Sequence, residues 1–173
     1  QIYLKKKLLK AEKVSMDRLY IKELESYKTA TEEEKKWIFK PEKNYYDFEK
    51  VKNEETRKKL KEFILYKAEN TSVQAMYHYV FLYNRICEFF NEDDIEFDPC
   101  KDGRKEILER YKAYLLKNGE ALFKEYVLRH DNKVHVYKPH SFYFLNQFLR
   151  FAYKEQYDEY ILYIGDFPGV SNN

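Results

Sequence analysis

Glycine and proline are scarce in this chain, with only four of each among its 173 residues. Folds built mainly from β-strands need many tight turns, and these two residues supply most of the backbone angles that such turns require. Lysine, glutamate and leucine are abundant instead, and all three favour helix. The sequence therefore predicts an all-α fold.

Composition also limits the class of protein. Hydrophobic residues make up 44% of the chain and charged residues 36%, which predicts a core beneath a densely charged surface. The net charge is only +2, so a basic footprint for nucleic acid would have to come from how the charges are distributed. No apolar run approaches the roughly 20 residues that cross a bilayer, and we expect no membrane association.

The cysteines and the N-terminal residues indicate the cellular compartment in which the protein is expected. Cys87 and Cys100 form no Cys-x-x-Cys pair and are too few for a disulfide scaffold, so we expect a reducing, cytoplasmic setting. Residues 1–7 are basic but lack the apolar stretch that follows in a signal peptide. Because the chain begins with Gln1, we expect it to be a fragment or a trimmed form of a longer protein.

The N-terminal part of the chain is predicted to be a helical extension. Residues 2–28 favour helix, as either one long helix or two shorter ones. Thr31 followed by Glu34 is the pattern of a capping box, which predicts a short helix that ends before Pro41. Residues 44–51 form a second short, aromatic-rich piece.

Four main helices are predicted from about residue 53 to residue 163. Asn53, followed by two glutamates, is a helix cap, and Asn118-Gly119 is a strong stop. The helices are expected at residues 54–69, 73–90 and 104–116 and from residue 140 onward. They are joined by a break at 70–72, an acidic loop at 91–103, and a connection with a short helix at 120–129 and a strand-like stretch at 131–137. The predicted core contains Leu60, Phe63, Ile64, Val80, Ile86, Phe90, Leu108, Leu115, Leu145, Phe148 and Phe151.

No motif of a complete catalytic or metal centre occurs in the sequence. His130, His135 and His140 recur at intervals of five, whereas helical metal ligands lie three or four residues apart. The chain has no HExxH, GxGxxG, GxxxxGK[ST] or GxSxG sequence. Cys87 falls on an apolar helix face, which is typical of a buried, inert thiol. We therefore expect no metal, no cofactor and no catalytic residue in this chain.

Four sequence features occur in a consistent order between residues 53 and 153. The first is the helix that holds Leu60, Phe63 and Ile64, and the second is the entry Thr71-Ser72-Val73-Gln74-Ala75-Met76-Tyr77, continued by Leu82, Ile86, Phe89 and Phe90. The third is the set Leu108, Tyr111, Tyr114 and Leu115, and the fourth is Phe144-Leu145, Phe148-Leu149-Arg150-Phe151-Ala152. Together they resemble the core-binding domain of tyrosine recombinases, the phage-integrase family.

The resemblance implies a four-helix core-binding bundle of the SAM-like type with a helical N-terminal extension. The implied ranges are 1–52 for the extension, 53–165 for the core-binding domain and 166–173 for a tail leading to a catalytic domain. Catalysis in that family needs an Arg, a Lys, a His-x-x-Arg and a tyrosine nucleophile. His130-x-x-Lys133 and His135-x-x-Lys138 are the nearest approaches to His-x-x-Arg. The fragment is therefore expected to be no enzyme, although its parent is a DNA recombinase.

The resemblance further implies that the domain clamps duplex DNA at the recombination site of a mobile element, alongside other recombinase protomers. Two helices would present their N-terminal ends to the major groove, where free N–H groups and the positive dipole end attract phosphate. The implied DNA contacts are Lys67, Thr71, Ser72, Gln74, His78, Lys138, Ser141, Tyr143, Asn146, Gln147 and Arg150. Gln147 or Arg150 would read a base.

A second function class remains open from the sequence. The mixed charges and the near-neutral balance also fit a helical protein–protein interaction module with no nucleic-acid role. Surface aromatics would then serve as interface anchors. Binding of duplex DNA distinguishes the two classes.

Overall fold

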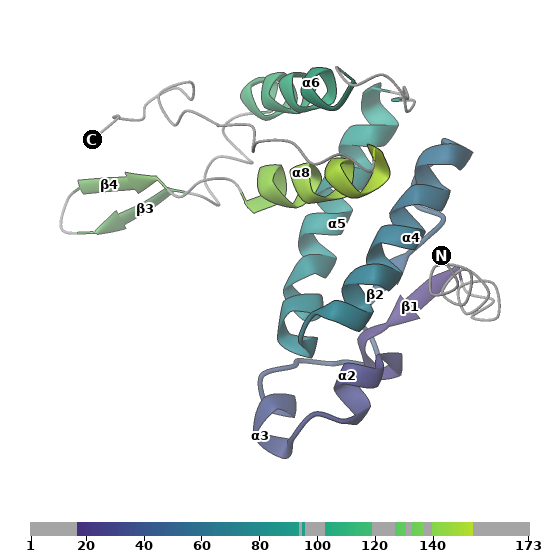
Figure 1. Cartoon of the computed structure of the whole chain (residues 1–173). Helices are drawn as coiled ribbons and strands as arrows, with labels where there is room; N and C mark the ends of the chain where they lie inside the picture. The colour runs from purple at the N-terminus through teal and green to yellow at the C-terminus, as the bar shows by residue number, and fades with distance from the viewer. Residues whose placement is uncertain are drawn as a thin grey trace. The chain divides into compact units, whose positions relative to one another are not determined.

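The computed structural model describes residues 17–93, 95, 103–118, 127–130, 133–136 and 140–153. The described part is mostly helical, and it contains two small antiparallel sheets of two strands each (Figure 1). The chain divides into two compact units, Gln1–Phe97 and Asp98–Asn173. The prediction of a mostly helical protein is therefore confirmed, while the four-helix core-binding type stays a prediction.

The elements of the two units follow one another along the chain. The first unit holds β1 (Arg18–Tyr20), the 3-10 helix η1 (Ile21–Glu23), α2 (Glu25–Lys28), α3 (Glu32–Lys35), β2 (Tyr45–Asp47), α4 (Glu54–Asn70) and α5 (Val73–Asp93). The second unit holds α6 (Gly103–Lys117), β3 (Val127–His130), β4 (Lys133–Val136) and α8 (His140–Tyr153).

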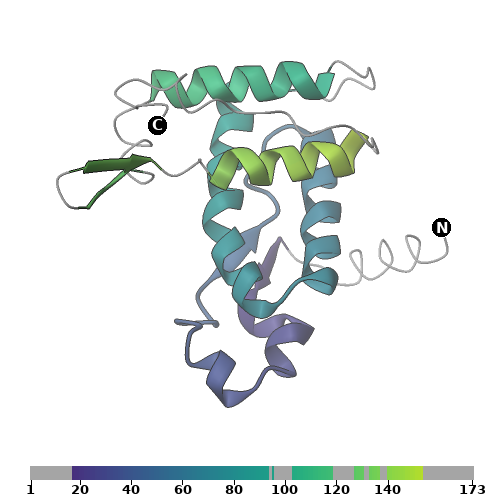
Figure 2. The same cartoon turned by 60° about the vertical axis from the view of Figure 1, so that its left-hand side comes forward.

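Helices α4 and α5 form a hairpin and lie side by side (Figures 1 and 2). The Asn53 side chain begins α4 by accepting a hydrogen bond from the backbone N–H of Thr56 at 3.1 Å. Ser72 begins α5 in the same way, since its Oγ accepts from the N–H of Ala75 at 3.2 Å. The predicted cap and the predicted break at 70–72 are confirmed. Buried side chains of both helices form the core, among them Leu60, Phe63, Ile64, Met76, Tyr83, Ile86, Phe89 and Phe90.

Residues 17–52 pack onto this hairpin and contain two strands as well as short helices. Strands β1 and β2 pair with Leu19 opposite Tyr46, and both of these side chains are buried. The Tyr46 hydroxyl donates to the carbonyl of Met76 in α5, and Tyr83 of α5 donates its hydroxyl to the carbonyl of Asp47 at 2.7 Å. These bonds place the two strands and α5 in one unit.

The prediction of helix for residues 2–28 is therefore wrong for β1. Within β1, Leu19 is buried between the exposed Arg18 and the half-buried Tyr20, which is the alternation of a strand. Residues 25–28 are helical as predicted, and residues 1–16 lie outside the described residues. The compact units divide after Phe97, whereas the predicted ranges divide after residue 52, and those ranges stay a prediction.

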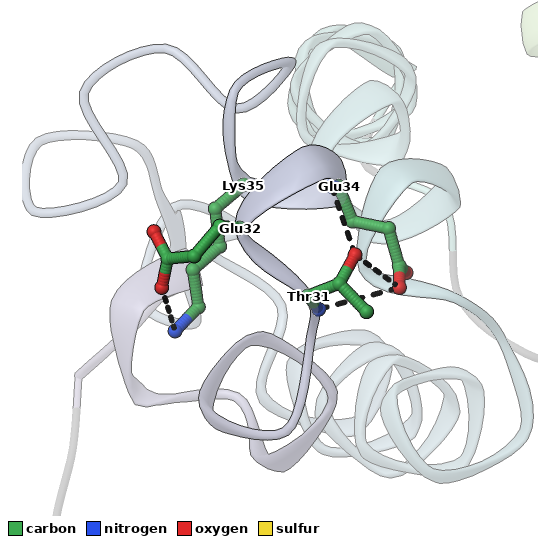
Figure 3. Close-up of polar contacts among 4 residues, drawn as sticks. All are labelled: Thr31, Glu32, Glu34 and Lys35. Carbon is green, nitrogen blue, oxygen red and sulfur yellow. Dashed lines mark hydrogen bonds and ion pairs between the residues drawn. The ribbon is translucent and has the colours of Figure 1, made fainter.

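Helix α3 begins with the predicted capping box (Figure 3). The Thr31 Oγ1 accepts from the backbone N–H of Glu34 at 3.2 Å, and the Glu34 carboxylate accepts from the N–H of Thr31 at 3.3 Å. An ion pair between Glu32 and Lys35, 4.0 Å apart, lies on the same single turn. The capping-box prediction is confirmed.

In the second unit, α6 and α8 pack side by side, and β3 pairs with β4. The core of this unit includes Ile107, Leu108, Tyr111, Leu115, Phe142, Phe144, Leu145, Phe148 and Leu149. The strand-like prediction at 131–137 is confirmed for Lys133–Val136, and the predicted short helix at 120–129 is wrong for residues 127–129, which belong to β3.

Most of the predicted core is buried. Val80 and Phe151 are the exceptions, because each is half-buried. Helix α5 runs to Asp93, so the predicted acidic loop cannot begin at residue 91. Among the described helices, none combines the length and the apolarity needed to cross a bilayer.

Candidate nucleic-acid interface

The junction of α4 and α5 brings together five of the predicted DNA contacts. Ser72, Gln74 and His78 are exposed, whereas Lys67 and Thr71 are half-buried. All five lie within the last turn of α4, the two-residue break, or the first two turns of α5. These five residues therefore lie around one helix start, and their contact with DNA stays a prediction.

Some backbone N–H groups at this helix start form hydrogen bonds with Ser72, and others have no acceptor among the described residues. The N–H of Ala75 bonds Ser72 Oγ, and the N–H of Met76 bonds the Ser72 carbonyl at 3.0 Å. The N–H groups of Val73 and Gln74 have no partner among the described residues. Free donors of this kind, at the positive end of a 21-residue helix, favour an anion such as a phosphate.

The hydroxyl groups of Thr71 and Ser72 both form hydrogen bonds within the protein. Thr71 donates its hydroxyl hydrogen to the carbonyl of Lys67 at the end of α4. Ser72 uses its oxygen as an acceptor, so its hydroxyl hydrogen is available to a ligand. Of the two, Ser72 is the better placed to contact a phosphate.

The Lys67 side chain is half-buried and lies against two aromatic rings. Its ammonium lies 5.7 Å from the centre of the Phe63 ring and 5.6 Å from that of the Tyr79 ring. Partial burial lowers the pKa of this ammonium below its ordinary value. A cation held over two rings is stabilised by their faces, and a phosphate would have to compete with that contact.

Gln74 and His78 begin a longer row of side chains on the outer face of α5. Phe81, Arg85 and Glu88 continue it at intervals of three and four residues, which is the spacing of a single helix face. Phe81 is 50% exposed, and the Arg85 guanidinium lies 4.9 Å from the centre of its ring. Sequence reasoning missed the second half of this row, although the 3.6-residue period of the polar positions was a usable signal.

Helix α8 carries the remaining predicted contacts, and it separates them into two groups. Tyr143, Gln147 and Arg150 follow one another at helical spacing, with Gln147 exposed and the other two half-buried. Ser141 and Asn146 are buried, with exposed fractions of 1% and 4%. Lys138 lies outside the described residues.

The burial of Ser141 and Asn146 argues against direct DNA contact. Ser141 Oγ accepts a hydrogen bond from the hydroxyl of Tyr111 at 2.7 Å, so it joins α8 to α6. The Asn146 side-chain oxygen is buried without a hydrogen-bond partner. Their polarity alone suggested a surface position, but both serve the interior of the second unit.

Two titratable groups, Tyr83 and Cys87, are buried side by side on α5. Burial raises the pKa of the Cys87 thiol to about 12, so the nucleophilic thiolate is suppressed. Burial likewise raises the pKa of the Tyr83 hydroxyl, which the adjacent Cys87 thiol contacts. Among the described residues, no group of three or more His, Cys, Asp or Glu side chains is arranged to hold a metal ion.

Comparison with known proteins gives no relative: no protein-family model, curated protein or solved structure matches this chain.

Proposed function

We propose that this chain binds duplex DNA as the core-binding part of a site-specific tyrosine recombinase, the integrase of a mobile element. The observation that carries the proposal is the α5 start, where the free backbone N–H of Gln74 lies beside the exposed side chains of Ser72, Gln74 and His78. The proposal also depends on the resemblance of residues 53–153 to that family.

Each part of the α5 start has a role in this proposal. The free N–H group of Gln74, with the Ser72 hydroxyl, binds one phosphate, whereas Val73 is only 1% exposed and is left out. The Gln74 amide both donates and accepts, so it suits the edge of an adenine in the major groove. His78, one turn further on, adds a donor to the neighbouring backbone.

A second contact face is proposed on α8. Gln147 and Arg150 are one turn apart on the helix, and both are able to form paired hydrogen bonds with a base. Tyr143 precedes them on the same face and offers a hydroxyl to phosphate. Ser141 and Asn146 are left out of the contact set because they are buried.

In this proposal the domain positions DNA and does not cut it. Strand cleavage in the resembled family belongs to a separate catalytic domain, and the 173 residues of this chain contain no His-x-x-Arg motif. We therefore expect no covalent protein–DNA adduct on a suicide substrate. Trapping such an adduct would contradict this part of the proposal.

Titration of a fluorescently labelled duplex, followed by anisotropy at several salt concentrations, tests the proposal. We expect weak binding whose logarithm falls with the logarithm of salt by about 0.9 for each phosphate neutralised. Lys67→Ala removes the lysine of the junction, and it should reduce that slope by about 0.9, the value for one phosphate. The matched control is Lys58→Ala, also on α4, whose ammonium lies 3.5 Å from Glu54 near the opposite end of the helix.

Base readout has its own test. Arg150→Ala and Gln147→Ala should weaken one duplex sequence more than others, whereas Lys67→Ala should weaken all sequences alike. Absence of binding by any duplex at about 50 mM salt, including the ends of the element, would defeat the DNA proposal.

A helical protein–protein interaction module is the alternative. The observation in its favour is that, within the part of the chain that the structure describes, four large hydrophobic side chains are exposed: Trp37, Phe39, Tyr66 and Phe81. Exposed aromatic residues are common anchors of protein interfaces. A chain that binds no duplex but forms a stable complex with a protein would establish this function instead.

A further inference from the structure

The turn between α3 and β2 exposes two aromatic side chains, and the isoleucine between them is buried. Trp37 is 71% exposed and Phe39 65% exposed, while Ile38 between them is only 6% exposed. Burying a large ring is normally favourable, so two neighbouring rings left in water call for an explanation. We call residues 36–44 the aromatic turn; it lies between α3 and β2 in Figures 1 and 2.

The aromatic turn is held in place by a set of hydrogen bonds. The N–H of Ile38 bonds the carbonyl of Lys35 at 3.1 Å, which continues the capped helix α3. The Asn44 side chain donates to the carbonyls of Phe39 at 2.6 Å and Lys40 at 3.0 Å. The N–H groups of Lys43 and Asn44 also bond the Lys40 carbonyl.

Lys40 has a left-handed backbone, with φ of 49°, which is uncommon for a residue with a β-carbon. Such a conformation persists only where its surroundings fix it, and the bonds from Asn44 do so. Trp37 and Phe39 are thus presented by a fixed backbone, with little ordering left for a ligand to impose.

The turn contains Lys36, Lys40, Glu42 and Lys43, of which Lys36 pairs with Glu33 at 3.8 Å. The N–H of Lys22 bonds the carbonyl of Pro41 at 3.0 Å, which brings another lysine alongside. None of Lys22, Lys40 and Lys43 forms an ion pair with a described carboxylate. The Lys40 ammonium lies 5.0 Å from the centre of the Phe39 ring. One aromatic face and one cation are therefore in contact, and the backbones of Lys22 and Lys43 lie in or beside the same turn.

This combination matches the two parts of an unpaired nucleotide, which has a flat base and a phosphate. We propose that the aromatic turn binds single-stranded nucleic acid, with bases stacked on Trp37 and Phe39 and phosphates near Lys22, Lys40 and Lys43. A duplex hides its base faces, so this is a second site, separate from the duplex contacts on α5 and α8. It does not depend on the recombinase proposal.

A membrane surface fits the same residues less well. Insertion into lipid favours a continuous apolar tip, but Ile38 is committed to the protein interior. The Lys40 ammonium over the Phe39 ring would also have to leave water with that ring. A base that stacks on the face of Phe39 opposite the Lys40 ammonium, by contrast, leaves that ammonium in water, beside a phosphate.

Trp37 is the only tryptophan of the chain, so its fluorescence reports on this turn alone. Titration of the whole chain with a single-stranded oligothymidylate, with excitation selective for tryptophan, should quench this emission as a base stacks on the indole. Phe39→Leu keeps the reporter and an apolar side chain but removes one ring face. It should weaken binding by about fivefold or more, the loss expected for one stacked base.

Two matched controls separate the aromatic turn from the rest of the surface. Phe81→Leu removes an aromatic ring exposed on α5, and it should leave single-strand binding unchanged. Gln74→Ala should weaken duplex binding and leave the quenching of Trp37 by the single strand intact. Lys40→Ala with Lys43→Ala should reduce the salt dependence by about 0.7 for each lost phosphate contact.

Three results would each overturn the proposal. The first is the absence of quenching by oligothymidylate at low salt. The second is equal binding by the parent chain and Phe39→Leu, which would place the strand elsewhere. The third is quenching by anionic vesicles of brominated lipid without quenching by the oligonucleotide, which would assign the aromatic turn to a membrane.

Discussion

Tyrosine hydroxyls hold several buried contacts of this protein together. Tyr46, Tyr83 and Tyr111 are buried, and each hydroxyl donates to an oxygen on another element: the carbonyl of Met76, the carbonyl of Asp47 and the hydroxyl of Ser141. The rings supply buried apolar surface, and the hydroxyls join segments that are far apart in the sequence. These three tyrosines therefore belong to the core, while the other described tyrosines are half-buried or exposed.

Stability should fall in alkaline solution because of these buried groups. Burial raises the pKa values of Tyr46, Tyr83 and Cys87 above their unfolded values, and that of Cys87 to about 12. The unfolded chain then loses protons first, so the stabilising contribution is complete below about pH 9 and declines as the pH rises above it. Urea denaturation from neutral to alkaline pH measures this decline, and Cys87→Ala should delay its onset. A constant unfolding free energy through that range would contradict the prediction.

Ile86 provides a test of packing in the core of the first unit. Its side chain is fully buried in α5, so Ile86→Ala should lower the free energy of unfolding by about 2–5 kcal/mol. Val80, on the same helix, is half-buried, and Val80→Ala should cost less. Chemical denaturation measures both, and equal losses would mean that the two positions pack alike.

Helix starts are the elements that the sequence predicted best. Asn53 and Thr31 form their caps as expected, because a cap depends on residues only two or three positions apart. The break at 70–72 and the start of α8 also follow from local chemistry. Residues 18–20 could not be predicted this way, since their strand exists only through pairing with Tyr45–Asp47.

The candidate site was predictable to a similar extent. Gln74, His78 and Gln147 are exposed because helical spacing places them away from the apolar positions. Ser141 looked like a surface residue, but its partner Tyr111 lies 30 positions away in the sequence, and no local pattern reveals such a bond. The aromatic turn escaped notice because the sequence pattern assigns Trp37 and Phe39 to a short helix and does not reveal their exposure.

The cap of α4 should contribute measurably to stability. Asn53→Ala removes the acceptor for the N–H of Thr56 and should cost about 0.5–2 kcal/mol. Asn53→Asp keeps an acceptor at the same position and should cost much less. Urea denaturation of the two variants measures the difference, and the prediction fails if alanine and aspartate are equally destabilising.

At the scale of the whole molecule, the chain consists of two compact units, Gln1–Phe97 and Asp98–Asn173. The first unit joins β1, β2, α4 and α5 by packing and by side-chain hydrogen bonds, and Asn91 of α5 also bonds the backbone of Lys50 and Lys52. The second unit joins α6 and α8 through Tyr111 and Ser141. The two proposed duplex contact faces therefore lie on different units.

The first unit should fold by itself. A polypeptide of residues 1–97 keeps the hydrogen bonds that join residues 17–52 to α5, so it should show a helical circular dichroism spectrum and unfold cooperatively in urea. Its Trp37 emission should match that of the whole chain. A non-cooperative transition, or loss of helix, would show that the first unit needs the second in order to fold.

The pairing of β1 with β2 has a consequence for how such a chain changes over evolutionary time. Ile21 and Asn44 are joined by a backbone hydrogen bond of 2.9 Å, so the stretch between them leaves the ribbon and returns to the same place. Stretches whose ends are already adjacent tolerate replacement by longer or shorter ones, because the surrounding backbone need not move. Related chains would then be expected to vary in length here, gaining or losing the turn that bears Trp37 while the helical hairpin beneath it is inherited unchanged.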